Sequence, residues 1–235
     1  MILPIDNFRE IFSQNGFDIS DTQYNNFSAY AELLVEWNQK INLTAITDPE
    51  GITIKHFLDS ILILKYAEIL KESSLIDVGT GAGFPAIPLK IYRNDINITL
   101  LDSLNKRINF LNEVSQKLNL PMISIHSRAE DGSKKPELRE KFDIATARAV
   151  AALPVLYEYC IPYVKVGGQF IALKGPNEDY KSANKELKLL GGELTDVKEY
   201  SLPGGDSRLL IVAKKISQTP SKYPRNSGQI LKKSL

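Results

Sequence analysis

The chain has 235 residues, a formal net charge of +1, and a composition that is 43% apolar and 24% charged, as in ordinary globular proteins. It contains no long uncharged apolar window and no basic region followed by an apolar core at its start, so we expect neither a membrane span nor a signal peptide. With one cysteine and two histidines outside any metal-ligand spacing, it is expected to lack disulfides and metal sites and to suit the reducing cytoplasm.

Residues 1–72 are predicted to form a helical segment that packs on the core of the protein. Ser20 and Gln23 have the spacing of a capping box, and the apolar residues that follow them recur at helical intervals. Asp48 followed by Pro49 predicts a second helix start, because these residues suit the N-cap and the first helical position. The leucine- and isoleucine-rich stretch that follows continues the helical pattern.

Residues 73–216 alternate between short apolar runs and amphipathic stretches. The apolar runs cover residues 75–78, 98–102, 122–126, 142–150 and 169–174. Such alternation predicts an α/β fold in which a mostly parallel sheet is covered by helices on both faces. Two further runs, 191–202 and 208–215, are separated by a Pro-Gly-Gly turn and predict an antiparallel hairpin at the C-terminal end of the sheet.

Residues 217–235 are predicted to form a basic, flexible tail. After Asp206 the sequence holds seven basic residues and no acidic one. A basic segment on a nearly neutral chain fits a polyanionic partner, and it fits a solubilising, disordered end equally well. Composition alone leaves both interpretations open.

The glycine-rich stretch LIDVGTGAGFPAIPLKI lies between a predicted strand and a predicted helix, where glycines and free backbone N–H groups can approach a ligand. Gly79, Gly81 and Gly83 occupy every second position, so the third glycine comes one place earlier than in the dinucleotide pattern. The bulky Phe84 follows it. Asp77, two residues before the first glycine, would repel a pyrophosphate and attract the α-ammonium group of an amino-acid-like ligand. This pattern favours S-adenosylmethionine over NAD.

Two acidic residues follow later predicted strands. Asp102 ends the second strand, where a carboxylate can accept hydrogen bonds from ribose hydroxyls in NAD and S-adenosylmethionine folds alike. Glu130 follows the third strand, where it can accept a hydrogen bond from the adenine amino group. Alternatively, Glu130 is a carboxylate at a helix N-terminus, where the helix dipole favours it. Because Glu130 follows the glycine turn and Asp102 in register, the ligand-binding interpretation is preferred.

Several motifs together resemble the RsmG family, also called glucose-inhibited division protein B, whose members methylate guanine N7 in 16S ribosomal RNA. The motifs are LVEWNQKINLTAIT, KHFLDS, LIDVGTGAGFPAIPLKI, LLDSLNKRINFL, SRAED, ATARAVAAL and FIALKG. The resemblance implies a class I methyltransferase fold with a Rossmann-like sheet, S-adenosylmethionine as cofactor, and 16S ribosomal RNA or the 30S subunit as partner. We expect a monomer, because nothing in the sequence demands more. It also implies cofactor contacts by Gly79 through Phe84, by Ala129 and Glu130, and by Arg148. After KYPR the sequence departs from the proline-rich end of that family.

Guanine N7 carries an unprotonated lone pair at neutral pH, so its methylation requires alignment and electrostatics rather than a general base. Arginine or lysine can read the O6/N7 edge of guanine, and O6 is the productive contact because a donor on N7 would block attack. Arg148 and Lys174 lie at the ends of predicted strands four and five, the edge where open α/β sheets bind ligands. We expect one of them to contact O6 or a nearby phosphate; an ion pair with a surface carboxylate is the alternative.

RNA binding requires cationic contacts with phosphates and usually aromatic stacking. The candidate residues are Lys40, Lys55, His56, Lys174, Arg208, Lys222, Tyr223 and Arg225. Two other functions remain open on the sequence: a nicotinamide-dependent oxidoreductase, against which Asp77 and Phe84 argue, and a non-catalytic RNA-binding assembly protein. Binding of S-adenosylmethionine against NADH tests the first, and a methyl-transfer assay on 16S RNA tests the second.

Overall fold

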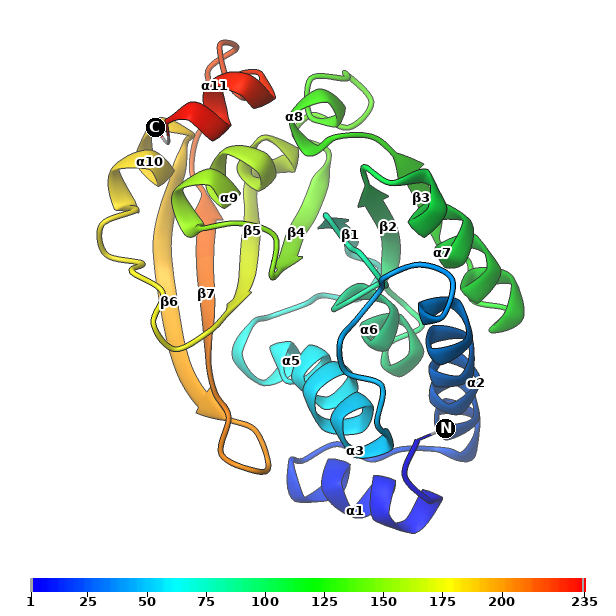
Figure 1. Ribbon diagram of the computed structural model, residues 1–235. Coiled ribbons are helices and arrows are strands. Elements are labelled where there is room, and N and C mark those ends of the chain that lie inside the picture. Colours follow the sequence, from blue (N-terminus) through cyan, green and yellow to red (C-terminus); the bar gives the residue numbers. More distant parts are fainter. Residues whose placement is uncertain (1, 234) are drawn as a thin grey trace.

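The computed structural model describes residues 2–233 and 235, and in this part of the chain the strands form one seven-stranded sheet (Figure 1). The strands are β1 (Ser74–Val78), β2 (Asn97–Asp102), β3 (Ile123–His126), β4 (Phe142–Arg148), β5 (Val164–Lys174), β6 (Gly192–Ser201) and β7 (Ser207–Lys215). Their order is β3-β2-β1-β4-β5-β7-β6, in which β1 to β5 run parallel and β7 is antiparallel to both of its neighbours. The predicted parallel sheet with a C-terminal antiparallel hairpin is confirmed.

Successive residues of the central strands face two separate hydrophobic cores. In β1, Leu75 belongs to the core on one face of the sheet and Ile76 to the core on the other. In β5, Ile171 and Ala172 divide in the same way. Because both faces are buried, these strands are continuous apolar runs rather than alternations of apolar and polar residues.

One core is shared by the N-terminal helices and by the helices that follow β1 and β2. These elements are α1 (Ile5–Gln14), α2 (Asp21–Asn38), α3 (Pro49–Gly51), η1 (Ile52–Leu58), α4 (Asp59–Ile61), α5 (Ile63–Tyr66), α6 (Ala86–Tyr92) and α7 (Asn105–Lys117). Helix α2 contacts α6 and α7, and α4 contacts α6. A cluster of aromatic rings that includes Phe8, Phe27 and Phe57 joins α1, α2 and η1, so the N-terminal segment and the sheet bury their apolar surface together.

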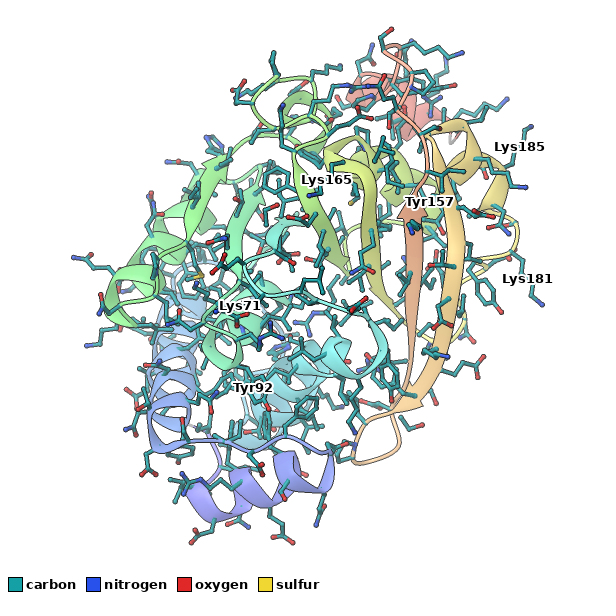
Figure 2. All side chains as sticks on the ribbon, turned by 180° about the vertical axis from the view of Figure 1, so that it is seen from behind. Lys71, Tyr92, Tyr157, Lys165, Lys181 and Lys185 are labelled. Atoms are coloured by element: carbon teal, nitrogen blue, oxygen red, sulfur yellow. The ribbon has the colours of Figure 1, made fainter. Side chains whose placement is uncertain are left out.

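The second core lies on the opposite face. It is covered by α9 (Leu153–Cys160), η2 (Ile161–Tyr163) and α10 (Asn184–Leu189), with α8 (Ala129–Gly132) and α11 (Ser227–Lys232) nearby (Figure 1). Tyr157 of α9 is fully buried and packs edge-on against Phe170 of β5, at 5.8 Å between ring centroids. Lys181 and Lys185, in contrast, point away from the protein (Figure 2).

The predicted helix starts are confirmed by their hydrogen bonds. Ser20 Oγ accepts from the Gln23 backbone N–H at 3.2 Å, and the Gln23 side chain accepts from the Ser20 N–H at 2.9 Å, which is a complete capping box. The Asp48 carboxylate accepts from the Gly51 N–H at 2.7 Å. The helix that begins there becomes π-helical in η1, a wider turn that often occurs at functional sites.

The C-terminal segment differs from the prediction of a flexible tail. Thr219, Tyr223 and Ile230 are buried, and α11 begins with its own capping box. The segment is held by two carboxylates: the Arg225 guanidinium pairs with the buried Glu158, and the Thr219 N–H donates to the partly exposed Glu140. Low complexity and basic charge alone could not reveal these partners, which are more than sixty residues away in the sequence.

Among the described residues, every helix is too short or too polar to traverse a bilayer. In the same part of the chain, no group of three or more histidine, cysteine, aspartate or glutamate residues is placed to hold a metal ion.

Candidate functional site

The predicted site residues lie at the carboxyl ends of neighbouring parallel strands. Asp77 is near the end of β1, Asp102 ends β2, Arg148 ends β4 and Lys174 ends β5. The strand order places β1 between β2 and β4, and β4 beside β5. The sheet therefore brings these four charged residues to one edge, the edge at which open α/β sheets bind ligands.

The glycine turn is built around backbone conformations that side chains disfavour. Gly83 has a φ of 96°, and a Cβ there would collide with the side chain of Ile87 and approach the Tyr30 hydroxyl. Gly81 has a φ of 60°, and a Cβ there would meet only the Gly79 carbonyl oxygen, at 4.0 Å, so the space over the turn is open. The third glycine thus packs the turn against helices, whereas the second leaves room beside the backbone.

Asp77 lies beneath the glycine turn rather than at its surface. Its side chain is fully buried and accepts hydrogen bonds from the Thr80 hydroxyl at 2.6 Å and the Thr146 hydroxyl at 3.1 Å. Burial raises the pKa of this carboxyl to about 7, although the two hydroxyls oppose that effect. Asp77 therefore fastens the turn to β4 and carries a proton that can be released near neutral pH.

Asp102 connects the glycine turn to the loop after β2. One carboxylate oxygen accepts from the Gly81 N–H at 2.9 Å, and the other accepts from the Leu104 N–H at 2.9 Å. Arg107 Nη1 lies 3.3 Å from the first oxygen. A carboxylate has about four lone-pair positions, so Asp102 retains capacity to accept a hydroxyl donor.

A cavity of about 170 Å³, which we call the donor cavity, opens between the ends of β1, β2 and β4. It is lined by Val78, Gly79, Leu101, Ser103, Ser127, Arg128, Ala129, Glu130, Val150, Tyr159 and Ser227. Gly79, Ala129 and Glu130 were predicted from the sequence. Ser103 and Ser127 lie within the motifs LLDSLNKRINFL and SRAED but were not singled out, and Tyr159 and Ser227 lie outside every motif.

Arg148 is partly buried at the end of β4 and is held by three neighbours. Its Nη1 donates to the Lys55 carbonyl at 3.1 Å and to Asp59 Oδ2 at 3.3 Å, and its Nη2 faces His56 Nδ1 at 3.3 Å. Its guanidinium lies over the ring of Phe84, 4.7 Å from the ring centroid. The expected ion pair thus exists, and its carboxylate is a buried one: Asp59 also accepts from the Tyr200 hydroxyl at 2.8 Å.

His56, which the sequence predicts to contact RNA, is buried in the folded protein. Its ring stacks on Phe84 with centroids 4.4 Å apart, and its Nε2 lies 2.8 Å from the Thr44 hydroxyl. Burial and the Arg148 charge lower the pKa of His56 to about 3. Because Arg148 can only donate, Nδ1 is the accepting nitrogen and Nε2 carries the hydrogen.

A second cavity of about 330 Å³, which we call the acceptor cavity, lies on the other side of the β4 end. It is lined by Ile46, Lys55, His56, Asp59, Arg148, Ala149, Leu173, Lys174, Gly175 and Arg208. Five predicted cationic or aromatic candidates therefore meet here, together with Asp59, which the sequence did not single out. Lys174 Nζ is held by the Ala151 carbonyl at 2.6 Å and by Glu178 at 2.8 Å, so it too forms an ion pair.

The two cavities are adjacent. Ala149 lines the acceptor cavity and the next residue, Val150, lines the donor cavity. Ala149 has a φ of 56°, a left-handed conformation that costs a non-glycine residue about 1 kcal/mol. Backbone strain of this kind concentrates at functional sites, where the surrounding contacts enforce it.

The remaining RNA-binding candidates lie elsewhere. Lys40 is at the end of α2, where it pairs with Glu36 at 2.8 Å. In the C-terminal segment, Lys222 lies over the ring of Tyr223, 5.2 Å from its centroid, and Arg225 pairs with Glu158 at 2.7 Å. These four residues do not line the acceptor cavity.

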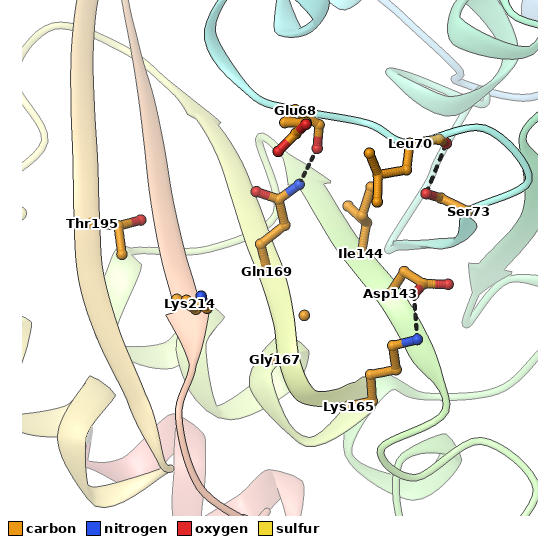
Figure 3. Close-up of a pocket in the computed structure, with 11 residues that line it drawn as sticks. Glu68, Leu70, Ser73, Asp143, Ile144, Lys165, Gly167, Gln169, Thr195 and Lys214 are labelled. Atoms are coloured by element: carbon orange, nitrogen blue, oxygen red, sulfur yellow. Dashed lines mark hydrogen bonds and ion pairs between the residues drawn. The ribbon is translucent and has the colours of Figure 1, made fainter.

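A third cavity, of about 360 Å³, lies at the opposite, amino-terminal edge of the sheet (Figure 3). Two contacts join residues of its walls: Lys165 forms an ion pair with Asp143 at 2.5 Å, and the Gln169 side chain donates to the Glu68 backbone carbonyl at 2.5 Å. None of the predicted site residues lines it. Size alone therefore does not identify the functional site of this protein.

Solved structures with the same fold include several methyltransferases. A Bacillus halodurans protein described as a putative methyltransferase aligns with a TM-score of 0.54 at 14% identity, covering 68% of this chain and all of that one. TYW2 from Pyrococcus horikoshii, solved with MeSAdo, aligns with a TM-score of 0.53 at 15% identity, covering 67% and 62%. At such identities only the fold is shared. That fold, with a glycine turn after β1, is that of the class I methyltransferases.

The family is identified by sequence. The profile of the GidB family, described as rRNA small subunit methyltransferase G, matches residues 23–210. The Ribosomal RNA small subunit methyltransferase G of Clostridium perfringens is 54% identical over 94% of both chains, and that of Desulforamulus reducens is 52% identical over 93% of both. The chain belongs to this family, and it is therefore an S-adenosylmethionine-dependent methyltransferase. The alternative of a nicotinamide-dependent oxidoreductase is excluded.

Proposed function

We propose that this protein transfers the methyl group of S-adenosylmethionine to N7 of a guanine in 16S ribosomal RNA, with the donor in the donor cavity and the guanine in the acceptor cavity. The observation that carries the proposal is that consecutive residues, Ala149 and Val150, line the two cavities. A methyl group passing between donor and acceptor would cross at this residue pair, at the ligand-binding edge of the sheet.

At the donor cavity, whose lining includes Gly79, the glycine turn from Gly79 to Phe84 would hold the methionine end of the cofactor. Asp102 would accept hydrogen bonds from the ribose, and Ala129 and Glu130 would meet the adenine. The buried charge of Asp77 would favour the cationic end of the donor through the turn that it supports. The open space beside Gly81 and the unused acceptor positions of Asp102 support this arrangement.

In the acceptor cavity, Arg148 is the residue that we assign to the O6 edge of guanine. Its guanidinium has five N–H donors, and its contacts with Lys55, Asp59 and His56 leave donors for a further acceptor. Lys174 already donates to the Ala151 carbonyl and pairs with Glu178, so we assign it to forming the cavity wall and contributing to its charge.

The proposed chemistry needs no proton acceptor, and we assign none. His56 is neutral, but its accepting nitrogen faces Arg148 and its N–H faces Thr44. The N7 lone pair can attack the sulfonium methyl directly, so catalysis would consist of alignment and electrostatic positioning by Arg148.

The charges at the rim of the acceptor cavity supply contacts for the RNA backbone. Lys55 and Arg208 are partly exposed there, and both pair with Asp206 on the β6–β7 turn. Phosphates can replace such a surface carboxylate, because exposed ion pairs contribute little stability. We assign Lys55 and Arg208 to phosphate contacts, and we expect the protein to act as a monomer, which light scattering tests.

The deciding experiment measures transfer of a labelled methyl group to 16S ribosomal RNA, both free and in 30S particles, followed by mapping of the modified base. Label on N7 of one guanine is the expected result, and the more active substrate form identifies the partner. Arg148→Ala should abolish transfer, whereas Arg9→Ala, which alters an exposed ion pair on α1, should not. Wild-type turnover by Arg148→Ala contradicts the assignment of Arg148; transfer to no ribosomal RNA overturns the proposed function.

A further inference from the structure

The C-terminal segment is fastened across the second core of the protein. The Arg139 guanidinium donates to the carbonyls of Thr219, at 2.9 Å, and Tyr223, at 3.0 Å. The Thr219 hydroxyl donates to the Leu190 carbonyl at 2.7 Å, and its N–H donates to Glu140 at 2.7 Å. These bonds fix the course of the segment as it leaves β7.

The strongest attachment is the pair formed by Arg225 and Glu158. The backbone N–H of Arg225 donates to Glu158 Oε1 at 2.8 Å, and its guanidinium donates to both carboxylate oxygens, at 3.0 Å and 2.7 Å. Glu158 is 1% exposed, so its charge is neutralised by Arg225 within the protein. Arg225 is consequently held in place by this contact, and its role in RNA binding stays a prediction.

The same pair positions two walls of the donor cavity. Tyr159 follows Glu158 on α9, and Ser227 follows Arg225 by two residues at the start of α11; both line the cavity. Helix α11 is held in turn by its Asn226 capping box and by Ile230, which is 1% exposed. Figure 1 shows α11 beside the end of α9. Residues more than sixty positions apart thereby close one side of the cavity.

We infer that Ser227 and Tyr159 bind the adenosine half of the methyl donor, and that the Arg225–Glu158 pair is their positioning device. This inference rests on the proposed function, which places the donor in this cavity. Ser227 enters a wall that already contains Ser103, Ser127 and Glu130. These hydroxyl and carboxylate groups are suited to the polar edge of an adenine and to ribose hydroxyls. The C-terminal segment is therefore part of the cofactor site.

The test compares two serines of the same segment by the same substitution. Ser227→Trp places a large ring in the cavity, whereas Ser221→Trp places it at an exposed position. Binding of S-adenosylhomocysteine and of 5′-methylthioadenosine is measured by calorimetry without RNA. We expect Ser227→Trp to lower the affinity for both ligands by at least about tenfold and Ser221→Trp to bind them as the wild type does. Circular dichroism should show that both variants are folded.

A second variant tests the positioning pair. Arg225→Ala should weaken the binding of 5′-methylthioadenosine and of S-adenosylhomocysteine by the same factor, because only adenosine contacts are lost. 5′-Methylthioadenosine retains the adenosine but lacks the amino-acid end. Equal affinities of the wild type and Ser227→Trp overturn the inference. Failure of the wild type to bind S-adenosylhomocysteine at all overturns the proposed function instead. If Arg225→Ala does not fold, the serine pair still decides the question.

Discussion

The guanidinium of Arg148 lies 4.7 Å from the centre of the Phe84 ring, so the end of β4 rests directly on the glycine turn after β1. The His56 ring stacks on the same phenylalanine at 4.4 Å. A cation over an aromatic face contributes about 0.5–2 kcal/mol, depending on its solvation. Phe84 therefore joins the residue assigned to the acceptor to the turn assigned to the donor, and it explains why a bulky ring follows the third glycine.

Arg148→Lys is expected to lower turnover about 100-fold while donor affinity changes less. Lysine keeps the charge but cannot contact Asp59, the Lys55 carbonyl and His56 together, since it lacks the planar fork. Positioning of this kind acts mainly on the transition state. The measurement is single-turnover methyl transfer alongside calorimetric donor binding, with Arg9→Lys as the control. Unaltered turnover in Arg148→Lys contradicts a role for the fork.

His56→Gln is expected to reduce the loss of stability in mild acid. The pKa of His56 is lowered from 6.5 to about 3 in the folded state, so between these values the unfolded state binds a proton that the folded state refuses. Stability therefore falls as pH drops from 6.5 toward 3, by at most about 1.4 kcal/mol per pH unit from this group. Urea unfolding at pH 7, 6 and 5 measures the slope.

The matched control is His126→Gln, since His126 is exposed and is the other histidine of the chain. A slope that is unchanged in His56→Gln, or equally reduced in both variants, contradicts the buried neutral state of His56.

The His56→Gln variant also tests the contact with Arg148, because glutamine can still accept a hydrogen bond. Turnover should fall less in His56→Gln than in His56→Leu.

Features that depend on neighbouring residues could be predicted from the sequence, and contacts between distant residues could not. The capping box of Ser20 and Gln23 and the position of Asp102 follow from spacing within one element and the turn beside it. Asp59 was missed because its partner Arg148 is 89 residues away, and nothing in KHFLDS states that its side chains face β4.

The burial of individual residues was also predicted wrongly, because it depends on contacts with residues that are distant in the sequence. Helical spacing defines a face but not the partner that covers it, and η1 turns His56 inward onto Phe84. The C-terminal segment was predicted to be flexible because its composition is basic. Its order comes from Glu140 and Glu158, which neutralise Lys215 and Arg225. Ser227 could not be recognised as a cavity residue before this folding-back was known.

Asp77→Asn is expected to keep or increase stability at pH 8 while weakening donor binding. Burial raises the pKa of Asp77 from 3.8 to about 7, so between these values the folded state holds a proton that the unfolded state releases. This group's contribution to stability is therefore present in acid and lost as pH rises toward 7. A neutral asparagine removes that loss, which is about 4 kcal/mol for a shift of this size. Its single amide oxygen can accept from one of the two hydroxyls, Thr80 or Thr146, while its NH2 group donates to the oxygen of the other.

Donor binding should respond in the opposite direction, since the variant lacks the negative charge that favours the donor's ammonium group. Urea unfolding at pH 5 and pH 8 and titration with S-adenosylmethionine at pH 8 measure the two effects. Asp196→Asn, on β6, serves as the control because its side chain is partly exposed and pairs only with Lys198. An Asp77→Asn protein that is less stable at pH 8 yet binds the donor normally contradicts both assignments.

Arg208→Gln is expected to flatten the salt dependence of RNA binding. Its guanidinium lies at the rim of the acceptor cavity, 3.7 Å from both Asp59 and Asp206. Each lost phosphate contact reduces the slope of log affinity against log salt by about 1. Lys214→Gln is the matched control, because Lys214 lines the cavity at the amino-terminal edge of the sheet, away from the proposed RNA surface (Figure 3). Fluorescence anisotropy with a 16S fragment at several salt concentrations measures both slopes. A smaller slope in Lys214→Gln than in Arg208→Gln would place the RNA on the opposite edge.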